Sequence, residues 1–184
     1  MFLLATVGTQ SSRDAGSAKT LFLLRHAKSS WDDPTLVDYD RPLAPRGRRA
    51  AARIAAHVGR QGISPALVLC SPAQRTRETL AAIAPELGAH EVAFEEGLYG
   101  AEAFELLDRL RAVSESVPSV LLVGHNPGLH ELALFLAEPS GEVGRVAEKF
   151  PTGALATLAV DGAWSELDEG GARLLEYVVP RELG

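Results

Sequence analysis

The chain has 184 residues, of which 46% are hydrophobic and 23% charged, a balance typical of a single globular domain with a sizeable core. One cysteine excludes an internal disulfide framework and suits a reducing, cytoplasmic compartment, and no apolar run approaches the roughly 20 residues that span a bilayer. The net charge of −6 and an aromatic content of 6% argue against an extended nucleic-acid surface.

The charges are unevenly divided along the chain. Residues 1–77 contain 12 Lys and Arg against 5 Asp and Glu, whereas residues 78–184 contain 6 against 19. Most of these charges are expected on solvated helix faces. The excess of cations in the first part also predicts a local positive site for an anion on an otherwise acidic protein.

Residues 1–19 are predicted to form a flexible leader. Their apolar start has no positive segment before it, so a signal peptide is not indicated, and the remainder is polar with Ser and Gly. The folded domain is therefore expected over residues 20–184.

From residue 20 onward, strand-like and helix-like patterns alternate. Short apolar runs predict strands over residues 21–24, 66–70, 91–96, 119–124, 153–160 and 173–179. Helical spacing predicts helices over 46–62, with Gly62 as the stop, over 101–116, with Phe104, Leu107 and Val113 among its apolar positions, and over 127–137. A further helix begins at Ser71 and carries Thr76, Leu80, Ile83 and Leu87 on one face.

Continuous apolar strands separated by helices predict a sheet that is covered on both faces. We expect one α/β domain, a three-layer sandwich with a mostly parallel central sheet flanked by helices. In such sheets, ligands bind beyond the carboxyl ends of the strands. Three predicted strands end in unusual chemistry: Leu24 leads into Arg25 and His26, Cys70 into "SPAQRTRET", and Val123 into "GHNPG".

The last two of these segments also have the form of helix starts. Ser71, Pro72 and Gln74 fit a capping box, with Ser71 as the N-cap, and in "GHNPG" Asn126 fits an N-cap and Pro127 the first helical position. Capping does not explain Arg75, because a cation in the first turn opposes the helix dipole. An anion bound at that end would reverse the sign of this interaction.

The histidines fall into two groups. His26 and His125 both follow a strand, whereas His57, His90 and His130 lie in helical patterns or a loop and are expected to be surface or packing residues. A zinc site built from His26, His125 and Cys70 is disfavoured, because no closely spaced pair of ligands supports it.

Together the strand ends supply two guanidinium groups, two imidazoles and helix N-termini, and this set matches a phosphoryl group. Arginine binds phosphoryl oxygens through two parallel hydrogen bonds, and helix N-termini favour anions. An imidazole in such surroundings can attack phosphorus and form a covalent intermediate. Arg77 is expected to point elsewhere on its helix.

The ordered motifs "LRHAKS", "SPAQRTRET" and "VGHNPG" resemble the histidine phosphatase superfamily, also called phosphoglycerate mutase-like, and most closely its SixA-type phosphohistidine phosphatase branch. The resemblance runs from about Thr20 and includes "DYDRPLAPRG" and "LYGAE". It implies that His26 is the phosphorylated nucleophile, that Arg25, Arg75 and His125 bind the phosphoryl oxygens, and that no metal or organic cofactor is needed.

The resemblance leaves a proton donor and the pocket lining less defined. A Glu in a segment like "ExxYG" donates the proton in larger members, which would correspond to Glu96; the alternative is a solvated carboxylate. Lys28 and Ser29 follow the nucleophile and could line the pocket. Ala27 replaces the glycine usual in "RHG", a substitution that leaves the Arg-His pair intact.

The expected activity is a phosphatase acting on a phosphohistidine protein or a small phosphate ester. A phosphoglycerate mutase-like phosphotransferase is the first alternative, but a mutase needs an enclosed site, and the chain is too short for the extra segments that mutases carry. A non-catalytic phospho-ligand binding module is the second, but it would be expected to lack the nucleophile or an arginine, and all four residues, Arg25, His26, Arg75 and His125, are present. Specificity is expected from the loops at 30–44 and 138–152. The sequence leaves the substrate and the oligomeric state open.

Overall fold

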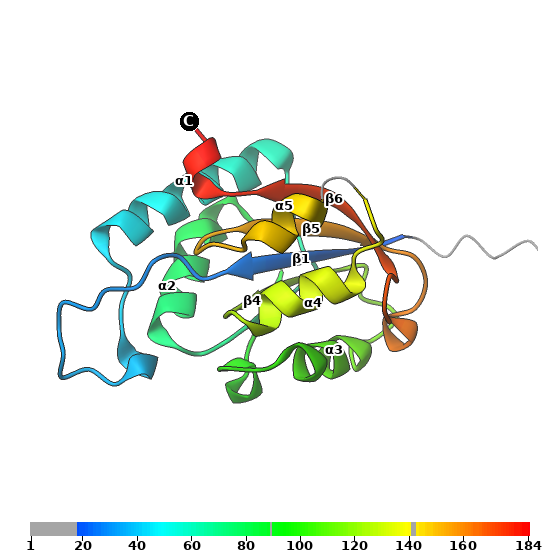
Figure 1. Cartoon of the computed structure of the whole chain (residues 1–184), viewed down its shortest axis with the longest axis horizontal. Coiled ribbons are helices and arrows are strands. Elements are labelled where there is room, and N and C mark those ends of the chain that lie inside the picture. The colour runs from blue at the N-terminus through cyan, green and yellow to red at the C-terminus, as the bar shows by residue number, and fades with distance from the viewer. Residues whose placement is uncertain (1–17, 89, 141–142) are drawn as a thin grey trace, which may run out of the picture.

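A six-stranded sheet forms the centre of the protein in the computed structural model, which describes residues 18–88, 90–140 and 143–184. The strands follow the order β3-β2-β4-β1-β5-β6 across the sheet, with β1 and β4 in its middle (Figure 1). Their bounds are β1 Lys19–Arg25, β2 Leu67–Cys70, β3 Glu91–Phe94, β4 Ser119–Gly124, β5 Leu155–Val160 and β6 Ala172–Val178.

The sheet is mixed: its first four strands in spatial order, β3, β2, β4 and β1, are parallel, and β5 and β6 are added antiparallel. β1 pairs with β4, β4 with β2, and β2 with β3, all in parallel. β5 pairs antiparallel with β1, and β6 antiparallel with β5. The prediction of a mostly parallel sheet in one α/β domain is therefore confirmed, and the last two strands form an antiparallel edge.

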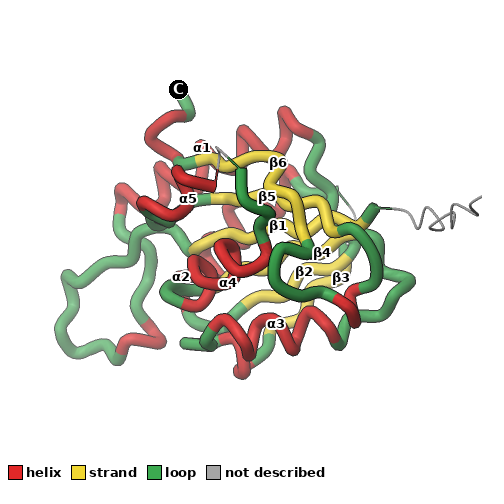
Figure 2. The backbone as a smooth tube through the Cα atoms, turned by 45° about the vertical axis from the view of Figure 1, so that its right-hand side comes forward, coloured by secondary structure: helices red, strands yellow, loops and turns green. Residues whose placement is uncertain are grey.

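Helices cover both faces of the sheet, which gives three layers (Figure 2). α1 and α2 pack together on one face, while α4 contacts both α3 and α5 on the other. The bounds of the helices are α1 Pro45–Gln61, α2 Gln74–Ile83, α3 Ala103–Arg111, α4 Gly128–Leu136 and α5 Val143–Glu148.

The alternation of side chains along β1 explains why the strand is apolar throughout. Leu21 and Leu23 belong to the core beneath α3 and α4, whereas Phe22 and Leu24 belong to the core beneath α1 and α2. Successive side chains of a strand point to opposite faces, so a strand covered on both sides needs an unbroken apolar run. The same reading holds for β4.

Two helix ends follow from local chemistry. Gly62 ends α1 in the left-handed conformation (φ 63°), as predicted, because glycine adopts it without a Cβ penalty. α3 is shorter than the predicted helix over 101–116. It begins after Glu102, whose side chain forms a capping box with Glu105, and it ends at Arg111.

Four other sequence-based expectations need correction. Phe104 is 60% exposed and does not face the core, although Leu107 and Val113 are buried as predicted. The helix that carries Thr76, Leu80 and Ile83 ends at Ile83, so Leu87 lies beyond it. The loop expected at 138–152 contains the short helix α5, and several strand bounds move by one or two residues.

Most of the predicted leader, residues 1–17, lies outside the described residues, while Lys19 at its end already belongs to β1. In the described ranges, no helix is both long and apolar enough to cross a membrane.

Candidate active site

The register of the sheet brings the three strand ends together. Leu24 of β1 lies beside Val123 of β4, and Val123 in turn lies beside Cys70 of β2. The residues that follow each of these positions therefore emerge side by side at the same edge. The backbone N–H of His26 donates to the carbonyl of Gly124 (3.1 Å), which fixes His26 next to His125.

The His26 imidazole is buried, with 8% of its surface exposed. Its Nδ1 lies 2.7 Å from the carbonyl oxygen of Ala27. Because a carbonyl can only accept, Nδ1 carries the proton in this hydrogen bond, and the lone pair of the ring is on Nε2. Burial lowers the pKa of His26 to about 3, and the charges of Arg75 and Arg25 lower it as well.

His125 is buried beside it, with a distance of 5.2 Å between the ring centroids. Nη2 of Arg75 lies 3.3 Å from Nδ1 of His125, and Nε2 of His125 lies 2.7 Å from Oγ of Ser71. A guanidinium can only donate, so Nδ1 accepts and Nε2 carries the proton, which it donates to Ser71. Burial, followed by the charge of Arg75, lowers the pKa of His125 to about 4.

The Arg75 guanidinium, on α2, is also buried and is held by a carboxylate that sequence reasoning missed. Nη1 donates to the carbonyl of Asp38 (2.6 Å), and Nη2 donates to its Oδ2 (2.9 Å). Asp38 also accepts from Nη1 of Arg41 and from the hydroxyl of Tyr99, both at 2.9 Å. Asp38 therefore fixes the guanidinium that faces His125.

The pKa of Asp38 lies below its ordinary value. Partial burial acts to raise it, but the hydrogen bonds from Tyr99 and Arg41 and the charge of Arg75 together outweigh burial. Asp38 is thus an ionised acceptor at neutral pH. This position lies in the quoted segment "DYDRPLAPRG", but nothing in the periodicity of that segment indicates that one of its two aspartates reaches Arg75.

Arg25 ends β1 directly before His26. Its Nη1 donates to the carbonyl of Phe150 (2.8 Å), while its buried Nε has no hydrogen-bond partner among the described residues. Burial lowers the pKa of Arg25 from its ordinary value. The guanidinium is therefore fixed through Nη1, and its other N–H groups have no hydrogen-bond partner among the described residues.

The helix-capping interpretation of both motifs is wrong. α2 begins at Gln74 after Ala73, with no side-chain cap, so Ser71 is not an N-cap and Pro72 is not at the first helical position. Ser71 instead accepts from His125, and Gln74 donates to Glu78. The sequence pattern failed because the chain extends two residues further before it turns into the helix.

In the other motif, α4 begins at Gly128 after Pro127, again with no side-chain cap. Nδ2 of Asn126 donates to the carbonyl of Phe150 (3.0 Å). Phe150 thus accepts from both Arg25 and Asn126, which ties the segment before β5 to the site.

The loop after His26 is fixed by several contacts. The backbone N–H of Ala27 donates to Oγ1 of Thr79, and Oγ of Ser29 accepts from Nη2 of Arg41 (2.8 Å). The Ser29 hydroxyl therefore stabilises the loop through its hydrogen bond with Arg41. Lys28 is half-buried and lies beside Arg25 in a neighbouring hollow.

Glu96 lies on the surface and is not bonded to the histidines or arginines of the site. Its Oε1 accepts from the hydroxyl of Tyr39 (3.0 Å), while the next residue but two, Tyr99, bonds Asp38 and lies edge-on to His125. Glu96 therefore has no direct contact with the imidazoles, and its role as a general acid stays a prediction.

The other predicted placements are mixed. Arg77 is exposed and lies over the ring of Phe94, so it points away from Arg75 as expected. His57 is buried against Glu176, and His130 bonds the carbonyl of Val146, so both are packing residues. His90 is half-buried in its loop.

Within the described ranges, no group of three His, Cys, Asp or Glu side chains is placed to hold a metal ion. Cys70 is buried, and burial raises the pKa of its thiol to about 12, which opposes the thiolate that zinc requires. The chemistry that this arrangement offers is that of two neutral imidazoles beside two permanent cations. It can stabilise a phosphoryl group and attack it.

Sequence relatives support the same interpretation. Residues 21–126 match the model of the histidine phosphatase superfamily (branch 1). An uncharacterized protein of Mycobacterium tuberculosis is 39% identical over 162 residues, which cover 86% of this chain and all of that protein. An uncharacterized chloroplastic protein of Arabidopsis thaliana is 34% identical over 140 residues, 71% of this chain and 64% of that protein.

Solved structures match over nearly the same length. A putative phosphohistidine phosphatase SixA from Nakamurella multipartita superimposes with a TM-score of 0.78 at 34% identity, covering 89% of this chain and 96% of that one. A putative SixA from Agrobacterium tumefaciens gives a TM-score of 0.75 at 30% identity, covering 88% and 99%. With the strand-end residues placed as described, the chain belongs to the histidine phosphatase superfamily, is similar to its SixA-type branch, and is a hydrolase with phosphatase activity.

Proposed function

We propose that the chain hydrolyses phosphoryl groups through a covalent phosphohistidine on His26. The observation that carries this proposal is the state of that imidazole: it is buried, neutral, and bonded through Nδ1 to the carbonyl of Ala27, which puts the lone pair on Nε2. A neutral imidazole is a competent nucleophile, whereas a protonated one is not.

Two half-reactions account for turnover. Nε2 of His26 attacks phosphorus, the N–P bond forms, and the bond from phosphorus to the leaving group breaks, with its electron pair departing on the leaving atom. Water then attacks phosphorus, the N–P bond breaks, and its electron pair returns to Nε2, releasing inorganic phosphate. The guanidiniums of Arg25 and Arg75 stabilise the charge on the phosphoryl oxygens, as cations do in phosphoryl transfer generally.

The leaving group decides whether an acid is needed. A phosphohistidine protein releases an imidazole, which requires little protonation, whereas an alkyl phosphate releases an alkoxide and requires a general acid. The resemblance to SixA structures favours phosphohistidine, and a small phosphate ester is the second substrate class. Glu96 is the proposed acid for that second class.

The test is to trap the intermediate. The chain is mixed with a radiolabelled aryl phosphate, quenched within milliseconds without acid, and digested to locate the label. We expect an acid-labile phosphate on His26, and we expect His26→Ala to lose both the label and turnover while its circular dichroism spectrum stays unchanged. The matched control is His130→Ala, which removes a packing imidazole outside the site.

Three outcomes would contradict the proposal. Label on another residue would reassign the nucleophile. Full activity of His26→Ala would refute covalent catalysis at this position. Tight phosphate binding by the wild type without any turnover would instead identify a non-catalytic binding module.

A further inference from the structure

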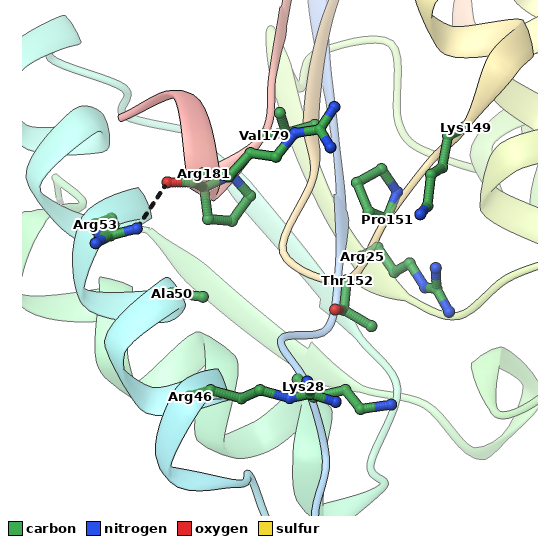
Figure 3. Close-up of a pocket in the computed structure, with 11 residues that line it drawn as sticks. Arg25, Lys28, Arg46, Ala50, Arg53, Lys149, Pro151, Thr152, Val179 and Arg181 are labelled. Carbon is green, nitrogen blue, oxygen red and sulfur yellow. Dashed lines mark hydrogen bonds between the residues drawn. The ribbon is translucent and has the colours of Figure 1, made fainter. Parts of the chain in front are cut away.

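A strongly basic hollow lies next to the candidate active site and shares Arg25 with it. The hollow has a volume of about 540 Å³ and is formed by β1, the loop after His26, α1, the segment before β5 and the residues after β6 (Figure 3). Six of its eleven lining residues are cationic, and none is acidic. They are Arg25, Lys28, Arg46, Arg53, Lys149 and Arg181.

These cations come from parts of the chain that are far apart in sequence. Arg46, Ala50 and Arg53 lie on α1 at the spacing i, i+4, i+7, which places them on one helix face. Lys149 precedes β5, and Arg181 follows β6. Figure 3 shows their side chains arranged around the hollow rather than spread along one surface strip.

The six cations are not neutralised within the fold. None of them forms an ion pair with a carboxylate among the residues that the structure describes. Two of them donate to backbone carbonyls instead: Arg25 to Phe150 (2.8 Å) and Arg53 to Pro180 (3.4 Å). Six like charges in one concavity repel one another, and the remainder of the protein is acidic enough to have supplied partners.

The start of α1 adds to this imbalance. The first turn of the helix contains no acidic residue, and Arg46 lies within it. A cation in the first turn opposes the helix dipole, and an anion held by that cation removes the conflict. The buried Nε of Arg25 lacks a partner among the described residues, so the guanidinium that the hollow shares with the site is not fully satisfied within the fold.

We propose that this hollow is a second anion-binding subsite, and that the substrate is a small molecule with at least two phosphate groups. One phosphoryl group binds at His26 and the other in the hollow, with Arg25 between them. This inference rests on the proposed function and, of its two substrate classes, selects the small phosphate ester over the phosphohistidine protein. Guanidinium groups match phosphate oxygens through paired hydrogen bonds, and four of the six cations are arginines.

The shape of the hollow favours a small molecule over an acidic protein. Its volume falls in the range of roughly 300–1,000 Å³ that is typical of small-ligand sites. A protein substrate docks instead over about 800 Å² of surface on each partner, which calls for a broad face and not for convergent cations.

Binding of phosphonates tests the subsite without relying on turnover, because their C–P bonds are not hydrolysed. Alkane-α,ω-bisphosphonates with spacers of two to six carbons are compared with the matching alkyl monophosphonates by isothermal titration calorimetry at one ionic strength. We expect at least one bisphosphonate to bind the wild-type chain about tenfold or more tightly than its monophosphonate, as one charge-assisted contact implies.

The double variant Arg46→Gln with Arg181→Gln should lose this preference and keep its affinity for the monophosphonate. The matched control, Arg60→Gln with Arg173→Gln, removes two exposed cations outside the hollow and should keep the preference. Arg60 lies roughly 21 Å along α1 from Arg46, so the control also tests for unspecific attraction.

Equal affinity for the two phosphonate classes would overturn the proposal, as would a preference that survives in the Arg46 and Arg181 variant. A greater gain for an acidic peptide with a phosphohistidine analogue than for any bisphosphonate would overturn it in favour of a protein substrate. If the preference is found but no phosphate ester or phosphohistidine is turned over, the subsite stands and the proposed phosphatase function fails.

Discussion

Gly47 is the residue through which a single added methyl group should disable the site without unfolding the protein. Gly47 is buried in the first turns of α1, and a Cβ built on it would lie 2.1 Å from the carbonyl oxygen of Lys28. Cβ atoms essentially never approach other heavy atoms closer than 3.0 Å, so the Lys28 carbonyl and the start of α1 must move apart by at least 0.9 Å. That carbonyl also accepts from the backbone N–H of Ala44 (2.8 Å), so it cannot move freely.

The expected magnitudes separate activity from stability. Overpacking costs about 1–3 kcal/mol, and alanine at the third position of the helix returns at most about 1 kcal/mol of helix propensity. We therefore expect Gly47→Ala to lower the free energy of unfolding by about 0–3 kcal/mol. The displaced loop carries His26 two residues earlier, and a misplacement of about 1 Å costs roughly 10²-fold in rate.

The assay measures kcat with an aryl phosphate and the free energy of unfolding by urea titration, for Gly47→Ala and for Gly59→Ala. Gly59 lies on the same helix, but the atom that its Cβ would meet is Oε2 of Glu86, the end of a flexible side chain that can rotate away. This control should keep its kcat and gain stability. A wild-type kcat in Gly47→Ala would refute the reasoning, as would a loss no larger than the unfolded fraction explains.

Three further predictions concern the charged groups. Arg75→Ala should lower kcat/KM by on the order of 10³–10⁵, whereas Arg77→Ala, on the exposed face of α2, should change it little; equal losses would contradict the assignment. The pKa values of His26 and His125 are about 3 and about 4, so the pH profile of kcat/KM should show no imidazole protonation near pH 6.5. The free energy of unfolding should nevertheless fall as the pH drops below about 6.5, because the histidines of the unfolded chain bind protons there and those of the folded chain do not. Glu96→Gln should slow alkyl phosphates strongly and phosphohistidine or aryl phosphates only slightly, and an unchanged ratio of the two kcat/KM values would remove Glu96 from the mechanism.

The sequence was sufficient to predict where the site lies, because strand ends are determined by local pattern. Leu24, Cys70 and Val123 each end an apolar run, and apolar strands separated by helices predict a largely parallel sheet. The carboxyl ends of parallel strands share one edge. The sequence therefore predicts that His26 and His125 lie together, and their ring centroids are 5.2 Å apart.

The partners of these residues could not be predicted in the same way. Asp38 reaches Arg75 over 37 positions, through a loop whose course no periodicity encodes, and Ser71 looked like a helix cap because its local motif fits one. The basic hollow was equally hidden, since Arg46, Lys149 and Arg181 belong to segments that only the folded chain brings together. Long-range packing decided these contacts, and local propensity did not.

Burial explains why the cations beside His26 and His125 are arginines and not lysines. Burial removes the charge from His26 and His125, which is what keeps a nucleophile available at neutral pH. The same burial would deprive a lysine of its charge, whereas the pKa of an arginine starts so high that Arg25 stays charged although burial lowers it. The site can therefore be dry enough to neutralise its imidazoles and still hold the positive field that a phosphoryl group requires. The lysines of the neighbouring hollow are under no such constraint, because Lys28 is only half-buried and Lys149 is exposed.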